Sequence, residues 1–168
     1  MSISMYQLSV PTFIHMLKNL EGILEKAAAH AESKKIEPSA LLNCRLFPDM
    51  FSMLRQVQIA SDGAKAGAAR LCGMEPPIFE DNETSFAELI ARLHKTIAYL
   101  ETFKPEQFAG SENKTITWKA RGGERSMQGM VYLNNYILPN LYFHITTAYD
   151  LLRHCGVEVG KKDYLGKV

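Results

Sequence analysis

Four stretches of this chain repeat apolar residues at intervals of three and four, the spacing that places side chains on one face of an α-helix. The first stretch runs from about Ser4 to Ser33. Pro11 near its start predicts either a helix that begins there or an earlier turn over Met5–Val10 joined through a kink. The stripe of this first helix consists of Phe13, Met16, Leu17, Leu20, Ile23, Leu24, Ala27 and Ala31.

The second stretch is predicted to begin at Pro48, because proline is favoured in the first turn of a helix, where its missing amide hydrogen is not needed. A short helical turn before it can start at Ser39. Gly73 follows the stretch as a C-terminal cap, since glycine adopts the left-handed conformation at little cost. The stripe of this second helix is Met50, Met53, Leu54, Val57, Ser61, Ala64, Ala68 and Leu71.

The third stretch opens on Ser85 and Glu88, which have the spacing of a capping box at a helix N-terminus. The segment before it, Met74–Asn82, contains two consecutive prolines and is predicted to be a loop. The helix is expected to end before Pro105. Its stripe is Phe86, Leu89, Ile90, Leu93, Ile97 and Leu100.

The fourth stretch begins near Tyr136 or Pro139 and ends near Cys155, with Gly156 placed as its C-terminal cap. The residues after it, Val157–Val168, are too polar and too rich in glycine for another long helix, and we expect them to pack back along the earlier helices. The stripe of the fourth helix is Leu141, His144, Ile145, Ala148, Leu152 and Cys155.

Residues 106–137, between the third and fourth helices, lack the helical period. Thr115–Ala120 is rich in residues that favour strands, Gly122 and Gly123 supply a turn, and Ser126–Leu133 is suited to a returning strand. The sequence therefore predicts a small β-hairpin or an irregular insertion at this point of the chain.

Four amphipathic helices joined by short connections most simply bury their stripes against one another. The expected fold is therefore all-α, an antiparallel four-helix bundle with the small insertion between helices three and four. The 168 residues are enough for one domain with its own apolar core, so we expect a single domain over residues 1–168.

Composition excludes several classes of function. The formal net charge is +1 with acidic and basic residues interspersed, which argues against binding to nucleic acid or to an anionic membrane. No apolar run has the length of a membrane span, and the N-terminus lacks the pattern of a signal peptide. The three cysteines are far apart and form no Cys-x-x-Cys pair, which argues against a disulfide framework or a thiolate zinc site. A cytoplasmic location is expected.

The residues with the most chemical interest are Asn140 and His144, which are four apart and so share one face of the fourth helix. Two interpretations are open. In the first, His144 is a buried neutral imidazole that hydrogen-bonds to a polar residue of another helix. In the second, the pair holds a divalent metal ion, with Asp49 as the best candidate for a third ligand. The first is favoured, because a strong metal site needs more donors than the sequence supplies.

Familiar catalytic motifs are absent from the sequence. It contains no Glu-x-x-His for a di-iron centre, no Gly-x-Ser-x-Gly, no phosphate-binding glycine loop and no dinucleotide fingerprint. Cys72 and Cys155 are predicted at helix C-termini, where the helix dipole disfavours a thiolate. No catalytic or cofactor-binding residue is assigned from the sequence.

Several runs of residues resemble a bacterial family of unknown function within the DinB/YfiT-like superfamily of metal-dependent enzymes. The most specific run is Leu138–Tyr149 on the fourth helix, followed by Leu152–Val157 and Gly160–Gly166. Arg45–Met50 and Ser4–Tyr6 add to the likeness. The resemblance covers nearly the whole chain.

This resemblance implies a four-helix bundle that associates as a homodimer. It also implies a divalent ion, commonly nickel or zinc, held by one histidine of helix two and two histidines of helix four spaced His-x-x-x-His. Asn140 and His144 have that spacing, and Asp49 lies where the ligand of helix two is expected. Only His144 keeps the residue type of the superfamily.

Two hypotheses of function follow. In the first, the chain is a dimeric binding or structural protein of the DinB-like class with a degenerate metal site, in which Asn140 and His144 belong to a polar network of the core. In the second, it is a divalent-metal-dependent hydrolase or a thiol-dependent transferase, in which Asp49, Asn140 and His144 hold nickel or zinc. A bound water with its pKa lowered to about 7 would then be the reactive group.

Overall fold

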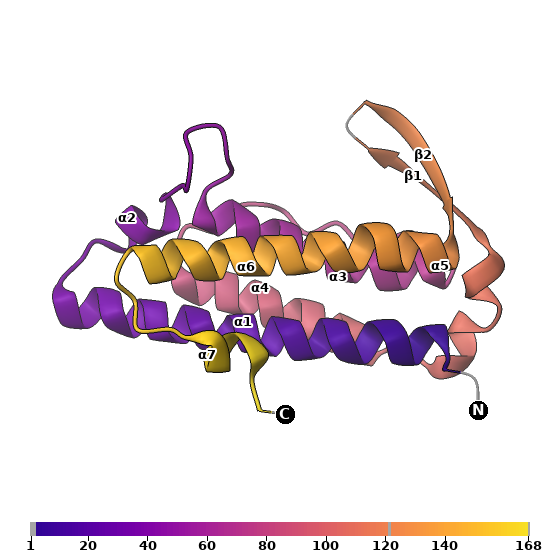
Figure 1. Cartoon of the computed structure of the whole chain (residues 1–168), viewed down its shortest axis with the longest axis horizontal. Coiled ribbons are helices and arrows are strands. Elements are labelled where there is room, and N and C mark those ends of the chain that lie inside the picture. Colours follow the sequence, from indigo (N-terminus) through magenta and orange to yellow (C-terminus); the bar gives the residue numbers. More distant parts are fainter. Residues whose placement is uncertain (1–2, 121, 168) are drawn as a thin grey trace.

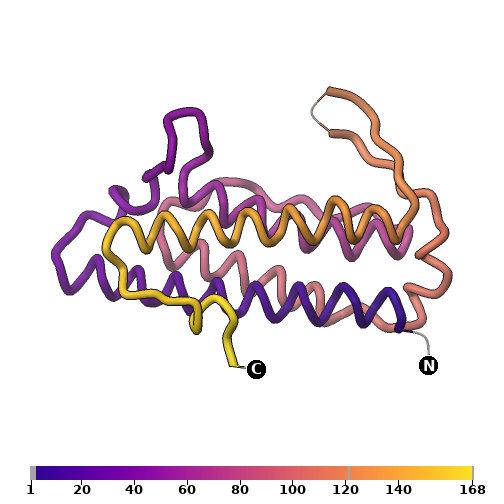
Figure 2. The backbone as a smooth tube through the Cα atoms, viewed as in Figure 1, coloured from indigo at the N-terminus to yellow at the C-terminus, as the bar shows by residue number. Residues whose placement is uncertain are grey.

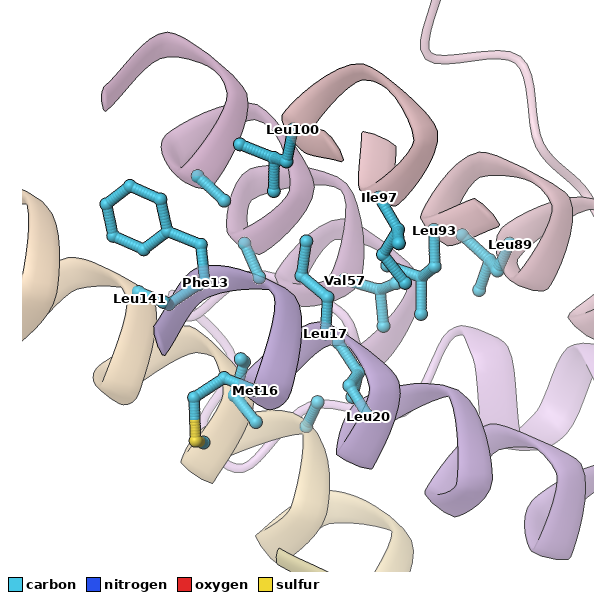
Figure 3. Close-up of a cluster of buried hydrophobic side chains, with 14 of the residues drawn as sticks. Phe13, Met16, Leu17, Leu20, Val57, Leu89, Leu93, Ile97, Leu100 and Leu141 are labelled. Carbon is cyan, nitrogen blue, oxygen red and sulfur yellow. The ribbon is translucent and has the colours of Figure 1, made fainter. Parts of the chain in front are cut away.

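The computed structural model describes residues 3–120 and 122–167. Its apolar side chains meet in one interior formed by four long helices that lie side by side along the molecule (Figure 1). Leu17 and Leu20 project into this interior toward Val57 and Leu93 (Figure 3). The four helices are α1 (Met5–Lys34), α3 (Met53–Leu71), α4 (Phe86–Glu101) and α6 (Leu138–His154).

Helix α1 begins before Pro11 and continues through it. Ser4 caps the helix by accepting a hydrogen bond from the Gln7 amide at 3.2 Å, and the Gln7 side chain accepts one from the Ser4 amide at 2.9 Å. This capping box satisfies amide groups that have no partner within the first turn. The strong N-terminal signal at Ser4 therefore determines where the helix begins, and Pro11 lies inside it.

The second long helix begins later than the sequence predicts. Pro48 and Asp49 lie in an exposed loop between the short helix α2 (Pro38–Leu42) and α3. Ser52 caps α3 by accepting a hydrogen bond from the Arg55 amide. Both serine and proline favour the start of a helix. The helix begins after Ser52 because the serine side chain accepts a hydrogen bond from an amide of the first turn, which the Pro48 side chain cannot do.

The third long helix and the insertion agree with the sequence. Ser85 and Glu88 form the expected capping box of α4. Two short 3-10 turns follow, and the hairpin consists of antiparallel strands paired from Thr115 with Gln128 to Ala120 with Gly123. The return strand begins and ends earlier than the expected Ser126–Leu133, because Gly129–Tyr132 is helical. The bounds are η1 (Pro105–Phe108), η2 (Ser111–Asn113), β1 (Thr115–Ala120) and β2 (Gly123–Gln128).

The fourth long helix is preceded by helical turns that the sequence analysis did not predict. They are α5 (Gly129–Tyr132) and a π-helical segment, η3 (Leu133–Ile137), and they run directly into α6. The C-terminal segment packs back as expected, because α7 (Lys161–Leu165) lies on α1. The Asn19 amide group donates to the Tyr164 carbonyl oxygen at 2.9 Å across this contact.

The directions of the helices depart from the expected antiparallel arrangement, because two neighbouring pairs, α3 with α4 and α1 with α6, run parallel (Figure 1). Neighbours α1 and α4 are antiparallel, since Lys18 pairs with Glu101 and Glu21 with His94. The C-terminal part of α3 also lies beside the first half of α1, where Gly67 is close to Phe13. Helices α3 and α4 therefore run in the same direction, which can be followed in Figure 2.

The length of the connection explains this parallel pair. Residues 72–85 can span roughly 45 Å when extended, whereas the 19 residues of α3 measure about 28 Å. The connection therefore returns along the whole helix before α4 begins. Asp81 and Glu83 on this crossover both form ion pairs with Arg92 of α4, at 3.0 and 2.8 Å, which holds the crossover against the helices.

None of the helices in the described ranges has both the length and the apolarity to cross a bilayer.

Candidate functional site

His144 lies on α6 with its ring turned toward α3, and only 9% of the residue is exposed. Its Nδ1 atom is 2.6 Å from the side-chain oxygen Oε1 of Gln56 on α3. The buried polar pair therefore joins the two helices that share the most extensive contact in the molecule. This agrees with the interpretation of His144 as a buried imidazole bonded to another helix.

A second hydrogen bond determines the tautomer of His144. The Gln56 amide nitrogen Nε2 donates to the Phe51 carbonyl oxygen at 3.2 Å. A carbonyl oxygen only accepts, so the amide orientation is set and Oε1 must face the imidazole. The bond to His144 is then donated by Nδ1–H, and the lone pair of the neutral ring is on Nε2.

The surroundings of His144 keep it neutral. Burial removes water that would stabilise the imidazolium ion, and the nearby positive charge of Arg55 adds to the effect, so the pKa of His144 falls from 6.5 to about 4. At neutral pH the ring is therefore a hydrogen-bond donor at Nδ1 and an acceptor at Nε2. It is too weak a base to remove a proton efficiently near pH 7.

The lowered pKa predicts a particular loss of stability in acid. An imidazole in the unfolded chain takes up a proton near pH 6.5, whereas the folded chain does so only near pH 4, so the contribution of His144 to stability is complete above pH 6.5 and lost as the pH falls toward 4. We expect a decrease on the order of 2–3 kcal/mol in the free energy of unfolding across this window. Urea titrations at a series of pH values measure it.

The matched variant for this pH effect is His144→Gln, which does not titrate. Its free energy of unfolding should change much less between pH 6.5 and pH 4.5 than that of the wild type. Substitution of His30, which is partly exposed at the surface of α1, serves as the control and should leave the wild-type slope intact. Equal slopes for wild type and His144→Gln would contradict the burial of this ring.

Asn140 is one turn before His144 and has a local partner. Its Nδ2 atom donates to the backbone carbonyl oxygen of Tyr136 at 2.6 Å. Tyr136 belongs to the π-helical segment, where the regular pattern of hydrogen bonds is interrupted, and Pro139 has no amide hydrogen to contribute. The Asn140 side chain therefore stabilises the backbone at the irregular turn. Its Oδ1 atom is the polar atom that could contact a ligand.

Asp49 lies apart from the helices that carry the other two residues. It is exposed, in the loop of residues 43–52, and not in the first turn of α3 where the sequence analysis placed it. Within the described ranges, no cluster of three or more histidine, cysteine, aspartate or glutamate side chains is arranged to hold a metal ion. Among Asp49, Asn140 and His144, only His144 offers an imidazole nitrogen as a metal ligand, through its Nε2 atom. A nickel or zinc site of this kind uses three protein ligands.

The sequence analysis missed Gln56, the partner of His144. Gln56 is 1% exposed and follows Met53 by three residues and precedes Ala60 by four, so it belongs to the buried face of α3. A polar residue at a stripe position was the available signal. The apolar stripe through Met53 and Val57 does not by itself show which polar side chains share that face.

An aromatic side chain borders the site. The Phe143 ring meets the His144 ring edge to face, with centroids 5.3 Å apart, and 55% of Phe143 is exposed. The loop that supplies the Phe51 carbonyl also carries exposed Phe47 and Phe51 side chains. A buried neutral imidazole thus lies next to exposed aromatic side chains.

The arrangement described above is that of a mostly helical protein with a two-stranded hairpin and a polar pair joining α3 to α6. A family model described as a domain of unknown function, DUF1993, matches residues 5–165. The chain therefore belongs to the DUF1993 family.

A solved structure supports the same assignment. The chain is similar to a protein described as a DinB family member from Shewanella denitrificans, with 48% sequence identity and a TM-score of 0.91. The match covers 97% of this chain and 92% of the other. A comparison with curated proteins found no match. The resemblance noted in the sequence to a DinB-like family of unknown function is thereby confirmed.

Proposed function

We propose that this protein is a dimeric binding protein with the DinB/YfiT-like four-helix-bundle fold, in which the Gln56–His144 pair is a polar element of the core and not a metal centre. The observation that carries the proposal is the hydrogen bond of 2.6 Å between His144 Nδ1 and Gln56 Oε1. The α3 residue that faces the His144 ring is therefore an amide, Gln56, and an amide is a much weaker ligand for nickel or zinc than an imidazole.

The other polar groups support the same proposal. Asn140 is bonded to a backbone carbonyl, and Asp49 is exposed on a loop. Each of the three candidate metal ligands thus has a structural reason of its own to be polar. The proposed ligand is a small uncharged molecule that donates a hydrogen bond to His144 Nε2 and lies against Phe143.

One observation favours the alternative, a divalent-metal-dependent hydrolase or thiol-dependent transferase. A histidine that ligates a metal through Nε2 usually donates its Nδ1–H to a fixed acceptor, and Gln56 is such an acceptor. His144 Nε2 and Asn140 Oδ1 would be the ligands from α6, with Asp49 brought in by movement of its loop. This alternative requires that movement of the loop, whereas the binding-protein proposal requires none.

Elemental analysis separates the two proposals. We expect protein purified without a metal-affinity column to contain well below about 0.1 nickel or zinc ion per chain. About one ion per chain in the wild type, lost in His144→Ala, would overturn the binding-protein proposal. The Glu21→Ala variant is a suitable control, because Glu21 lies on α1 in an ion pair with His94, outside the α3–α6 contact.

The same sample tests the dimer. Static light scattering at micromolar concentration should give the mass of two chains of 18.9 kDa. A mass of one chain would reject the dimeric part of the proposal and leave the assignment of the Gln56–His144 pair unaffected.

A further inference from the structure

A small cleft lies between the C-terminal end of α3 and the base of the hairpin (Figure 1). Its volume is about 210 Å³. It is about 21 Å along α3 from Gln56, so it is separate from the Gln56–His144 pair. The cleft is lined by Arg70, Gly73, Met74, Glu75 and residues 114–117.

Two cations, Arg70 and Lys114, line this cleft without an acidic partner. Among residues 3–120 and 122–167, no carboxylate forms an ion pair with either of them. The lining contains one acidic side chain, that of Glu75, and this residue is exposed. Because the cations outnumber the acid, the cleft carries a net positive charge at neutral pH and attracts anions.

A buried tyrosine holds the Arg70 side chain in place. The Nη1 atom of Arg70 donates to the Tyr132 hydroxyl oxygen at 3.2 Å. Tyr132 is fully buried, and its ring packs on Trp118 and Tyr136 with centroids 4.9 and 5.8 Å away. Burial raises the pKa of the Tyr132 hydroxyl, so this group stays neutral and does not compensate the charge of Arg70.

The bond to Tyr132 leaves part of the Arg70 guanidinium available. Its Nε–H and one N–H of Nη2 point the same way, and neither nitrogen has a hydrogen-bond partner in the described part of the chain. Two parallel N–H donors match the two oxygen atoms of a carboxylate. Lys114 adds a second positive charge, and Thr115 and Thr117 also line the cleft.

We propose that this cleft binds a small organic carboxylate, with Arg70 as the bidentate donor and Lys114 as the second cation. A volume of about 210 Å³ is below the range of sites for drug-sized ligands, so the ligand is a short aliphatic acid. Met74 and Ile116 supply apolar lining for its hydrocarbon part. This second site goes beyond the function proposed above and does not depend on it.

Trp118 is the only tryptophan of the chain, which makes its fluorescence a probe of the cleft. It packs on Tyr132, whose hydroxyl group is bonded to Arg70, so a ligand that draws on Arg70 should change the emission. We expect sodium propionate to give a saturable change with a dissociation constant on the order of 1–10 mM. Propionamide, which lacks the charge, and sodium chloride at the same ionic strength should give none.

Substitutions test which residues bind the carboxylate. Arg70→Lys keeps the charge without the fork of donors and should weaken propionate binding about tenfold or more, and Lys114→Gln should also weaken it. Glu75→Gln should tighten binding, because it removes the acid that competes with the ligand. Lys119→Gln is the charge-matched control, since Lys119 is an exposed residue of the same strand outside the cleft. His144→Gln should bind propionate as the wild type does.

Saturation-transfer NMR of the propionate protons measures the same binding without relying on Trp118. The proposal is wrong if neither method shows saturation up to about 100 mM propionate, or if propionamide binds equally well. It is also wrong if Lys119→Gln weakens binding as much as Lys114→Gln, or if His144→Gln abolishes it. Lys114 and Glu75 are exposed, so their variants keep the test decisive even if Arg70→Lys does not fold. The metal content of the protein, which tests the proposed function, has no bearing on these results.

Discussion

Replacing Arg92 by alanine should lower the free energy of unfolding by about 3–5 kcal/mol, because it removes one side of a buried ion cluster. The Arg92 side chain is 2% exposed and is enclosed between α3, α4 and the crossover of residues 72–85. Glu83, whose side chain is only 10% exposed, would lose its cation while remaining buried. Arg92 donates to Ser61 Oγ at 3.2 Å, Asp62 Oδ1 at 2.9 Å, Glu83 Oε1 at 2.8 Å and the Glu80 carbonyl oxygen at 3.0 Å.

Urea unfolding followed by circular dichroism measures this loss. Arg92→Lys keeps the charge without the planar fork of donors, so it should fall between the wild type and Arg92→Ala. Lys18→Ala is the matched control, because its ion pair with Glu101 is exposed on both sides and is worth at most about 1 kcal/mol. Equal losses for Arg92→Ala and Lys18→Ala would show that the Arg92 cluster does not stabilise the crossover.

The Arg92 cluster also makes the free energy of unfolding depend on pH in acid. Burial by itself would raise the pKa of Glu83, but the hydrogen bonds from Arg92 and Gln58 outweigh burial, and the pKa lies below its ordinary value of 4.5. The stability that Glu83 contributes is therefore present above pH 4.5 and lost as the pH falls through its lowered pKa. In Arg92→Ala this acid-dependent part of the stability should decrease, because only the hydrogen bonds from Gln58 and the backbone then oppose the effect of burial on the Glu83 pKa.

Replacing Gly129 by alanine should destabilise the protein by about 3 kcal/mol or more. Gly129 begins α5 directly after the hairpin, and its amide donates to the Lys114 carbonyl oxygen at 2.9 Å. A Cβ atom at this position would be 1.8 Å from the backbone oxygen of Ser111. A backbone atom cannot rotate away as a side chain can, so the turn η2 and the helix α5 would have to separate.

Two other glycines show whether the cause is steric. A Cβ atom at Gly63, inside α3, meets nothing within 4 Å, so Gly63→Ala should raise the stability by up to about 1 kcal/mol through helix propensity. A Cβ atom at Gly67 would be 2.8 Å from Ile137, a side chain that can adjust, so Gly67→Ala should be intermediate. Wild-type stability in Gly129→Ala would show that η2 does not pack against α5 in this way.

The sequence predicts the helices well wherever the local signals agree. Ser85 and Glu88 mark the start of α4, and the first stripe from Phe13 to Ala31 is buried throughout in α1. The hairpin was predicted because β-prone residues flank a pair of glycines. These features depend on residues a few positions apart, so they can be predicted from the sequence without knowing the fold.

The errors arose where two local signals compete or where the connection is long. Pro48 and Ser52 both favour a helix start, and the serine prevailed, which moved Asp49 out of the helix. Residues 74–82 were predicted to be a loop, but the direction in which the connection between α3 and α4 crosses the molecule depends on what it packs against. Arg92 holds this connection in place through its ion pairs with Asp81 and Glu83. Helical periodicity identifies only the apolar residues of α4 and so gives no sign of this role.

Of the two residues that form the candidate site, the sequence predicted one. His144 was expected in the core because it lies between Leu141 and Ala148 on one helical face, and it is buried there. Its partner Gln56 was not identified, because 88 positions separate the two residues in the sequence. The contact exists only because α3 and α6 run antiparallel in a particular register.

The sequence by itself determined which faces of the helices are apolar, where most of them begin, and that an imidazole is carried on the inner face of the last one, because helical periodicity and capping are properties of neighbouring residues. The tertiary structure decided that α3 and α4 run parallel and that Gln56 meets His144. Those outcomes depend on how helices pack across the whole molecule, and the periodicity of each helix is compatible with more than one such packing.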